Sequence, residues 1–253
     1  MKNETNKFIL IADYGRSGQG WLSYMLCYIL NATYIEPYNF LSGIKYSSSK
    51  HVLSLSKGRL PNRKFTDYSL VIKTHSYPAV NFNLTNKVLY LTRDPRDVAV
   101  SAYFRHRVNS KENKGPEKLV IKTLKGKIKH FLLNFKTINY AYTAVKWKKH
   151  VLSWEHISSY KVRYEDLSEN TEMVISGILG YLGTKIEKKI ISEAIENFSF
   201  RMITGRDRGN VDNNNPEFRK GIVGDYKNNF NSVQLKIFKI ICFDAALKYH
   251  YKL

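Results

Sequence analysis

Two adjacent cations stand beside flexible glycines near the C-terminus of the chain. Arg219 and Lys220 precede Gly221, and Gly224 follows three residues later. Arginine presents a fork of N–H donors, lysine adds a compact positive charge, and glycine lets the backbone approach a bound anion closely. This combination is typical of a phosphate-binding turn. A solvated surface loop is the alternative, because the chain contains 41 Lys and Arg residues.

A second candidate anion site follows the first apolar run, Phe8–Ala12. The segment Asp13–Gly20 contains three glycines, and an apolar helical pattern begins at Trp21. A strand, a glycine turn and a helix in this order surround an anion with backbone N–H groups and with the partial positive charge of the helix N-terminus, about half a unit. The segment lacks the Gly-Lys-Ser/Thr ending of a Walker loop, so Mg²⁺-dependent nucleoside triphosphate chemistry is not predicted.

A third candidate follows the apolar run Val88–Thr92. Arg93 leaves the carboxyl end of this expected strand, where ligands bind in open α/β sheets, and Ser101 lies two turns into a helix expected to begin at Pro95. A guanidinium and a hydroxyl in this arrangement can share one phosphate. An ion pair between Arg93 and Asp97, with Ser101 as a small packing residue, is the alternative.

Short β-type runs alternate with longer helical patterns along the chain. This alternation predicts an α/β fold, with a central parallel β-sheet flanked by α-helices. The 253 residues are expected to form a single domain, 1–253, around one large core. The expected strands are Phe8–Ala12, Leu70–Lys73, Val88–Thr92 and Lys161–Arg163. The expected helices, besides the one at Pro95, are Trp21–Leu30, Phe131–Val151, Thr171–Leu182, Lys188–Asn197 and Val233–Tyr249.

Two segments have the composition of long loops. Glu36–Asp67 is rich in Ser, Lys and Gly, and Thr204–Asn215 is rich in Gly, Asn and Asp. Long loops in compact domains are often functional. Because the second segment immediately precedes the Arg219 turn, it is a candidate gate over the ligand, with an ordinary surface loop as the equal alternative.

The formal net charge of +20 and the pI near 9.8 indicate an anionic ligand or surface. Charge alone does not choose among nucleotide, nucleic acid, acidic glycan and membrane. The basic residues are spread along the chain without an aromatic-rich RNA-binding pattern, so much of the excess is expected to be solvated surface.

The cysteines and the apolar runs indicate the cellular compartment in which the protein is expected. Cys27 and Cys242 both lie in apolar helical segments, which favours buried thiols, although a disulfide between them stays open. The run Phe8–Ala12 is too short for a signal peptide, and no apolar run approaches the ~20 residues of a membrane span. A soluble, cytoplasmic protein without a membrane span is expected.

In this order, the three candidate sites resemble the PAPS-dependent sulfotransferases, a P-loop-like nucleotide-binding family that uses 3′-phosphoadenosine-5′-phosphosulfate (PAPS). Asp13–Gly20 resembles the family's 5′-phosphosulfate loop, Arg93–Ser101 its 3′-phosphate motif, and the Arg219 turn its C-terminal Arg-Lys-Gly segment. Two further elements match, Lys73-Thr74-His75 after one strand and Tyr164-Glu165-Asp166-Leu167 after another. The resemblance covers most of the chain, and several motifs in the correct order are far more specific than any one of them.

The resemblance implies a nucleotide site built from several segments. The residues implied for the 5′ end are Arg16, Ser17, Gly18, Gln19 and Gly20, and those implied for the 3′-phosphate are Arg93, Ser101, Arg219, Lys220 and Gly221. By the same resemblance, Trp21 stacks on the adenine, Tyr164 lines the nucleoside pocket, and Phe200 covers the other face of the base. Taken singly, each of these aromatic residues fits a core position as well.

His75 is the expected general base. An acceptor hydroxyl must lose its proton as it attacks the sulfur, and imidazole can take up a proton near neutral pH. Lys73 and Arg16 are expected to stabilise charge on the transferring group and on the departing 5′-phosphate. The family usually has lysine where Arg16 stands, and threonines where this chain has Gln19 and Gly20, so the detailed role of Arg16 is open.

The sequence therefore predicts an enzyme that transfers a sulfuryl group from PAPS to an acceptor hydroxyl, on a glycan or a small molecule, with PAP as product and no metal. A kinase of related fold and a basic nucleic-acid-binding module are the alternatives, and no nucleic-acid partner is expected. The chain has Asn231, Ser232 and Lys236 where some family members carry a dimerisation element, so that dimer contact is not predicted and the oligomeric state is open.

Overall fold

The computed structural model describes residues 7–35, 66–78, 87–112, 128, 132–212, 215 and 217–253. Most of the expected loop Glu36–Asp67 lies outside these residues. The chain divides into two compact units, each described here by itself. Unit 1 contains Met1–Thr92 and Ser153–Gly205, and unit 2 contains Arg93–Leu152 and Arg206–Leu253. The single domain expected from chain length stays a prediction.

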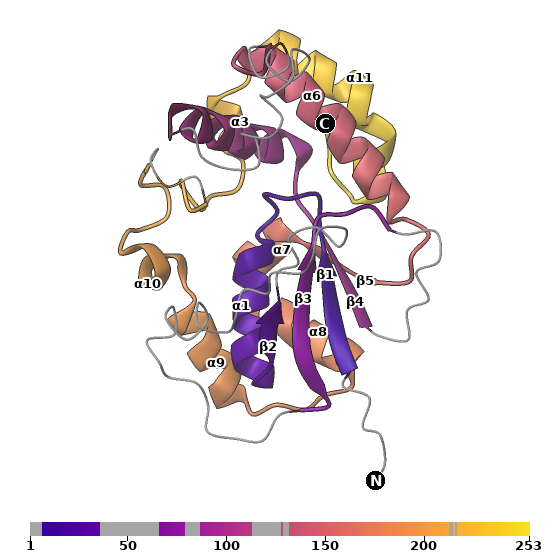
Figure 1. Ribbon diagram of the computed structural model, residues 1–253, viewed down its shortest axis with the longest axis vertical. Helices are drawn as coiled ribbons and strands as arrows, with labels where there is room; N and C mark the ends of the chain where they lie inside the picture. The colour runs from indigo at the N-terminus through magenta and orange to yellow at the C-terminus, as the bar shows by residue number, and fades with distance from the viewer. Residues whose placement is uncertain are drawn as a thin grey trace. The chain divides into compact units, whose positions relative to one another are not determined.

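Unit 1 is built on a parallel sheet (Figure 1). Among the described residues, its five strands are hydrogen-bonded in the order β2-β3-β1-β4-β5, and each pairing is parallel. The strands are β1 (Lys7–Ala12), β2 (Thr33–Ile35), β3 (Tyr68–Thr74), β4 (Lys87–Thr92) and β5 (Tyr160–Arg163). Because parallel strands end at a common edge, the segments that follow β1 and β3 come together, with Ala12 opposite Thr74 in register.

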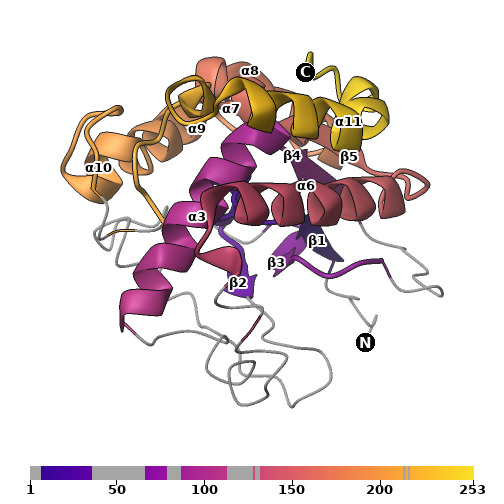
Figure 2. The same cartoon turned by 90° about the horizontal axis from the view of Figure 1, so that it is seen from above.

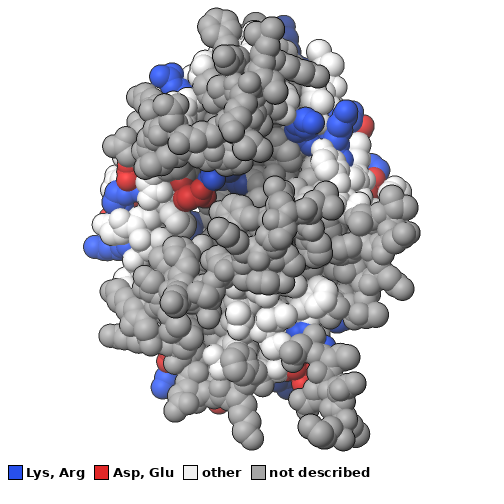
Figure 3. All heavy atoms as spheres, in the orientation of Figure 1, with Lys and Arg blue, Asp and Glu red and all other residues white. Residues whose placement is uncertain are grey.

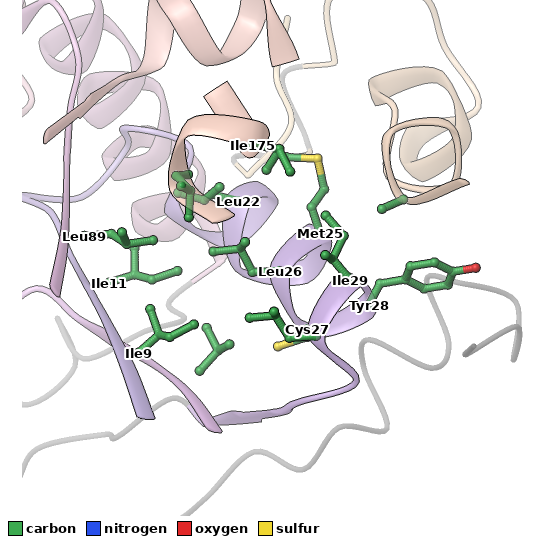
Figure 4. Close-up of a cluster of buried hydrophobic side chains, with 14 of the residues drawn as sticks. Ile9, Ile11, Leu22, Met25, Leu26, Cys27, Tyr28, Ile29, Leu89 and Ile175 are labelled. Atoms are coloured by element: carbon green, nitrogen blue, oxygen red, sulfur yellow. The ribbon is translucent and has the colours of Figure 1, made fainter. Parts of the chain in front are cut away.

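Helices cover the sheet of unit 1 and bury its core. They are α1 (Gln19–Leu30), α7 (Tyr164–Glu169), α8 (Thr171–Leu182), α9 (Lys188–Asn197) and α10 (Phe200–Thr204). Leu22 and Leu26 of α1 point toward Ile11 and Leu89 of the sheet (Figure 4), and all four side chains are almost fully buried. Burial of each such side chain contributes about 1.5–3 kcal/mol. This packing fixes the start of α1, and therefore the glycine turn before it, at the edge of the sheet.

Unit 2 is helical. Its elements are α3 (Pro95–Glu112), α6 (Lys136–Ser153, except for its last residue), the 3₁₀ turn η1 (Asp225–Asn228) and α11 (Ser232–Lys248). α6 and α11 lie alongside one another (Figures 1 and 2), and the buried Cys242 thiol contacts the Ala144 carbonyl oxygen at 3.6 Å. Tyr140 of α6 stacks on Phe230 with ring centroids 4.4 Å apart. This contact anchors the segment that joins η1 to α11.

The predicted fold class is confirmed, and most predicted elements begin or end within two residues of their observed limits. The described part of α6 begins at Lys136, later than the expected start at Phe131, which lies outside the described residues. The short elements β2, α7, α10 and η1 were not predicted. Both cysteines are buried free thiols.

Two features bear on the surface of the molecule. In the described part of the chain, no helix combines the length and the apolar character needed to cross a membrane. On the face shown in Figure 3, Lys and Arg side chains of the described residues appear in several separate places. This distribution agrees with the expectation that much of the positive charge is spread over the surface.

Candidate active site

The glycine turn between β1 and α1 has an unusual backbone. Gly15, Arg16 and Gly18 all have left-handed φ angles, of 106°, 63° and 87°. At Gly18 a Cβ atom would lie 2.6 Å from the Tyr164 ring, so only glycine fits there. Arg16 adopts this conformation with a side chain, which costs roughly 1–2 kcal/mol. A turn of this kind directs successive backbone N–H groups to one side and creates a concave anion site.

Gln19 ties the turn to the sheet. Its side-chain amide donates to the carbonyl oxygens of Ile11 and, at 3.0 Å, of Thr74, at the ends of β1 and β3. Gln19 is buried, so its implied contact with the 5′ end of a nucleotide would come from its backbone N–H. The Ser17 hydroxyl donates to the Gly15 carbonyl oxygen at 3.4 Å, within the turn itself. These contacts hold the turn in one conformation.

Two of the three predicted aromatic residues meet at the turn. The rings of Trp21 and Tyr164 lie edge to face, with centroids 6.4 Å apart, and Tyr164 also packs against Gly18. Tyr164 is the first residue of α7 and directly follows β5. Phe200 begins α10 in the same unit and is buried.

His75 lies beside the same turn. It follows β3, and its Nδ1 is 2.5 Å from Asp13 Oδ1 and 3.3 Å from the Asp13 carbonyl oxygen. A Cβ atom at Gly15 would be 3.8 Å from the His75 ring. The His75 side chain is 47% exposed, whereas that of Asp13 is fully buried. Lys73 precedes His75 by two residues, opposite Ile11 in β1. Unit 1 therefore brings the turn and the Lys73-Thr74-His75 element together.

In unit 2, α3 organises the predicted 3′-phosphate residues. Asp97 and Ser101 are four residues apart in α3, and this spacing places them along one face. Arg93 precedes the helix by two residues. Arg93 Nη2 donates to the Ile222 carbonyl oxygen at 2.8 Å and also lies 3.5 Å from Asp97, so the ion pair considered as its alternative role is present. The buried Asp97 carboxylate accepts the N–H groups of Gly224 and Tyr226 at 2.7 and 2.9 Å. Asp97 thus fastens the C-terminal turn to α3.

The two adjacent cations of the turn converge on one carboxylate. Arg219 and Lys220 both pair with the buried Asp225, the latter at 2.7 Å. Burial by itself would raise the pKa of Asp225, but the Lys220 hydrogen bond and the nearby Arg219 charge hold that pKa below its usual range. The Arg219 guanidinium also lies 4.2 Å from the centre of the Phe104 ring of α3. Both cations are therefore oriented by the fold itself.

The expected gate segment contacts the same turn. The backbone N–H groups of Gly209 and Asp212 donate to the carbonyl oxygens of Lys220 and Arg219, at 2.8 and 3.0 Å. Gly221 has a φ of 65°, a left-handed conformation that suits glycine. The segment 205–212 contains no helix or strand after α10 ends. A gating role for it stays a prediction.

Two carboxylates with a place in these sites were given no role from the sequence, Asp13 and Asp225, and Asp97 was considered only as an ion-pair partner of Arg93. A search for phosphate-binding residues favours cations and glycines and passes over acidic residues. The available signal was position, because Asp13 directly follows an apolar strand and a charged residue there faces the ligand edge of a parallel sheet. Among the described residues, no group of three or more His, Cys, Asp or Glu side chains is arranged to hold a metal ion. The absence of a metal requirement stays a prediction.

The fold and these motifs define a class of enzyme. The family model described as "Sulfotransferase domain" matches residues 6–248. The chain therefore belongs to the sulfotransferase family. Its predicted resemblance to the PAPS-dependent sulfotransferases, and the predicted class of enzyme, are confirmed.

Individual relatives agree with this assignment. The chain is 28% identical to sulfotransferase 1B1 of Mus musculus, across 92% of this chain and 80% of the relative. It is 27% identical to 3-beta-hydroxysteroid sulfotransferase of Cavia porcellus, across 96% of this chain and 85% of the relative.

A solved structure has the same fold. The crystal structure of mouse sulfotransferase SULT7A1 complexed with PAP matches with a TM-score of 0.56 and 21% identity, covering 95% of this chain and 84% of that one. At this level of identity the likeness shows the fold alone.

Proposed function

We propose that this enzyme uses PAPS as donor and transfers its sulfuryl group to an acceptor hydroxyl, with His75 as the general base. The observation that carries the proposal is the left-handed glycine turn with His75 beside it, at the carboxyl edge of a parallel sheet. This arrangement places a group that can accept a proton next to a site for an anionic donor.

PAPS supplies an activated sulfuryl group on its 5′-phosphate. The backbone N–H groups of Arg16–Gly20 and the N-terminus of α1 bind that end, and left-handed φ angles at Gly15, Arg16 and Gly18 fit such a cradle. Lys73 and the Arg16 guanidinium stabilise the charge that grows on the 5′-phosphate oxygen. Arginine in place of the usual lysine keeps a fixed positive charge and offers more donors.

The 3′-phosphate binds to the cations of unit 2. Arg93, Arg219 and Lys220 supply positive charge, the Ser101 hydroxyl supplies a donor, and Gly221 permits a close backbone approach. The buried carboxylates Asp97 and Asp225 keep these groups in place before the nucleotide arrives. Such preorganisation lowers the cost of ordering the site on binding. For the base, the edge-to-face pair of Trp21 and Tyr164 offers an aromatic surface, and Phe200 covers the other face.

The His75 ring carries out the proton transfer. As the acceptor oxygen attacks, its proton passes to the ring, a new O–S bond forms, and the bond between sulfur and the 5′-phosphate oxygen breaks with its electron pair on the phosphate. The half-exposed ring is accessible to an acceptor, whereas the buried Asp13 carboxylate is not.

The acceptor is proposed to be a hydroxyl on a small molecule. The named relatives support this choice, because one is a 3-beta-hydroxysteroid sulfotransferase. A glycan hydroxyl is retained as a second arm of the experiment, since the net charge of +20 favours acidic partners. A cytoplasmic location stays a prediction.

The test is a radiolabelled transfer assay with ³⁵S-PAPS against a panel of hydroxysteroids, phenols and sulfated and unsulfated sugars. Transfer to any hydroxyl acceptor is expected in the presence of EDTA. His75→Ala is expected to lower the transfer rate by about a hundredfold to ten-thousandfold, leaving a measurable residual rate, while PAP affinity, measured by calorimetry, changes less than about twofold. If wild-type protein transfers no label, or binds ATP with Mg²⁺ more tightly than PAP in EDTA, the kinase alternative is favoured. If His75→Ala keeps full turnover, His75 is not the base.

A further inference from the structure

We infer that Asp13 is a positioning residue for His75: the buried carboxylate orients the imidazole and stabilises the positive charge that the ring gains when it takes the acceptor proton. This inference rests on the proposed function, because it concerns the base of that reaction. The resemblance to the family gave roles to Arg16–Gly20 of the glycine turn but none to Asp13.

The geometry fixes which ring nitrogen reacts. His75 Nδ1 faces two oxygen atoms of the same residue, Asp13 Oδ1 at 2.5 Å and the Asp13 carbonyl oxygen at 3.3 Å. A carboxylate and a carbonyl oxygen both accept hydrogen bonds, so Nδ1 carries the hydrogen. The lone pair of the neutral ring is then on Nε2, which becomes the atom that takes the proton.

Asp13 and His75 differ in burial, and this difference assigns them different roles. The Asp13 side chain is fully buried and cannot meet an acceptor, whereas the His75 side chain is 47% exposed. Among the described residues, His75 Nδ1 is the polar contact of Asp13 Oδ1, which accepts no well-aligned hydrogen bond, and Oδ2 accepts only the Ser17 N–H at 3.4 Å. A buried carboxylate with so few donors is costly, and a nearby imidazole is the group that offsets this cost.

The position of Asp13 is also unfavourable for anion binding. It precedes the turn that is proposed to hold the phosphosulfate, where a negative charge opposes the donor. A neutral side chain could hold the turn without repelling the anionic donor. The negative charge of Asp13 is favourable only when the His75 ring becomes positive during proton transfer.

The backbone on both sides of His75 is held independently of Asp13's carboxylate. The Thr74 carbonyl oxygen accepts from the Gln19 side chain at 3.0 Å and from the Asp13 N–H at 3.2 Å. The buried Trp154 indole donates to the Ser76 carbonyl oxygen at 3.1 Å. The main freedom left to His75 is therefore rotation of its ring, and the Asp13 carboxylate limits that rotation.

The experiment combines Asp13→Asn with His75→Ala in a double-mutant cycle. Asparagine keeps the shape of Asp13 and removes its charge. With saturating ³⁵S-PAPS and an acceptor from the panel, Asp13→Asn is expected to lower kcat about tenfold to a hundredfold. Asp13→Asn is expected to leave PAP binding as tight as in the wild type or tighter, because a negative charge near the phosphates is removed, and to change the acceptor KM less than about twofold. Asp67→Asn is the matched control in the same unit: Asp67 is exposed, pairs with Lys7, and should leave kcat unchanged.

The cycle distinguishes action through His75 from any other role. In the His75→Ala background, adding Asp13→Asn is expected to change the residual rate less than about twofold. An equal loss of rate in both backgrounds would overturn the inference, as would an unchanged kcat in the single variant. A loss of PAP affinity that matches the loss of rate would show that Asp13 braces the turn instead.

A second readout needs no turnover. In a histidine ring ¹⁵N spectrum of the protein without nucleotide, the His75 signals are identified as those lost in His75→Ala. Asp13→Asn is expected to move these signals and to leave those of the other histidines in place. Unmoved signals would contradict the contact itself. If the wild-type protein transfers no sulfuryl group, the proposed function is contradicted. The spectrum still tests whether Asp13 contacts His75, because it does not depend on turnover.

Discussion

The candidate sites of the two units are formed by different chemical groups. In unit 1, a strained backbone forms the candidate site: three residues of the turn have left-handed φ angles, and the groups proposed to bind the anion are mainly N–H donors of the main chain. In unit 2, charged side chains form the site: Arg219 and Lys220 converge on Asp225, and Asp97 ties the same turn to α3. One site depends on shape, and the other depends on charge.

This difference indicates what each site tolerates. A binding site formed by the backbone cannot easily change its conformation. A single methyl group added to the turn is therefore expected to weaken binding strongly. A cluster of charged side chains loses affinity in increments as cations are removed, and its attraction weakens as salt is added. The two sites are therefore expected to respond differently to substitution.

The largest effect is expected for Gly18→Ala. A methyl group there lies 2.6 Å from the Tyr164 ring, and the φ of 87° is unfavourable for alanine. Turnover and PAP affinity are both expected to fall by about a hundredfold or more, because the turn and Tyr164 must move. Gly180→Ala in α8 is the control, since no atom lies within 4 Å of the added methyl group. Equal behaviour of the two variants would show that the turn is not shape-dependent.

The next effect is expected for Arg219→Ala. Removing one charged donor from the 3′-phosphate site should weaken PAP binding by about 1.5–3 kcal/mol, which is roughly tenfold to a hundredfold. Lys239→Ala, an exposed position on α11, removes the same charge outside the site and should change the affinity little. Calorimetry at two salt concentrations separates a local contact from a general charge effect. Similar losses in both variants would assign the effect to net charge.

A smaller effect is expected on stability. Asp225→Asn removes the carboxylate that holds Arg219 and Lys220, and should lower the free energy of unfolding by about 1–3 kcal/mol at neutral pH. Because the pKa of Asp225 is depressed in the folded protein, its contribution is complete above the unfolded pKa and disappears as pH falls through the folded pKa. Urea unfolding of both proteins from pH 7 down to about pH 3 should therefore show a shrinking difference. A difference that is constant with pH would rule out the ionic contact as its source.

The smallest effect concerns the two thiols, one in each unit. Burial raises the pKa of Cys242 to about 12, and burial also raises the pKa of Cys27. Little thiolate is therefore present near neutral pH, and neither cysteine should react with a disulfide reagent in the native protein. Both should react after unfolding in guanidinium. Rapid labelling of one thiol in native conditions would show that its unit opens more readily than the other.

The sequence predicted the long elements well because their patterns are local. Thr171–Leu182 and Lys188–Asn197 were predicted with the observed limits, since their apolar spacing matches one helix face. The three-residue strand Thr33–Ile35 was missed because it is too short to show alternation and is stabilised by its pairing with β3. The helix α7 was missed because Tyr164–Glu169 gives barely more than one turn of pattern.

The candidate site was predicted only in part, for a related reason. The cations and glycines were recognisable from residue type and order. The contact between Asp13 and His75 depends on β1 and β3 being neighbours in the sheet, with Ala12 opposite Thr74. That strand order is a property of the tertiary fold, so the local sequence around Asp13 does not reveal its partner. The pairing of both cations with Asp225 was not predicted either. A carboxylate repels phosphate, so a search for phosphate-binding residues gives it no role.

The central claim is that the enzyme recognises an adenosine nucleotide phosphorylated at both its 5′ and 3′ ends. Calorimetric titration of the wild-type protein with PAP and with adenosine 5′-monophosphate, in EDTA and at one salt concentration, tests it most directly. The 3′-phosphate is expected to strengthen binding by about a hundredfold or more, the least that two charge-assisted contacts contribute. Equal affinities for the two nucleotides would contradict the claim.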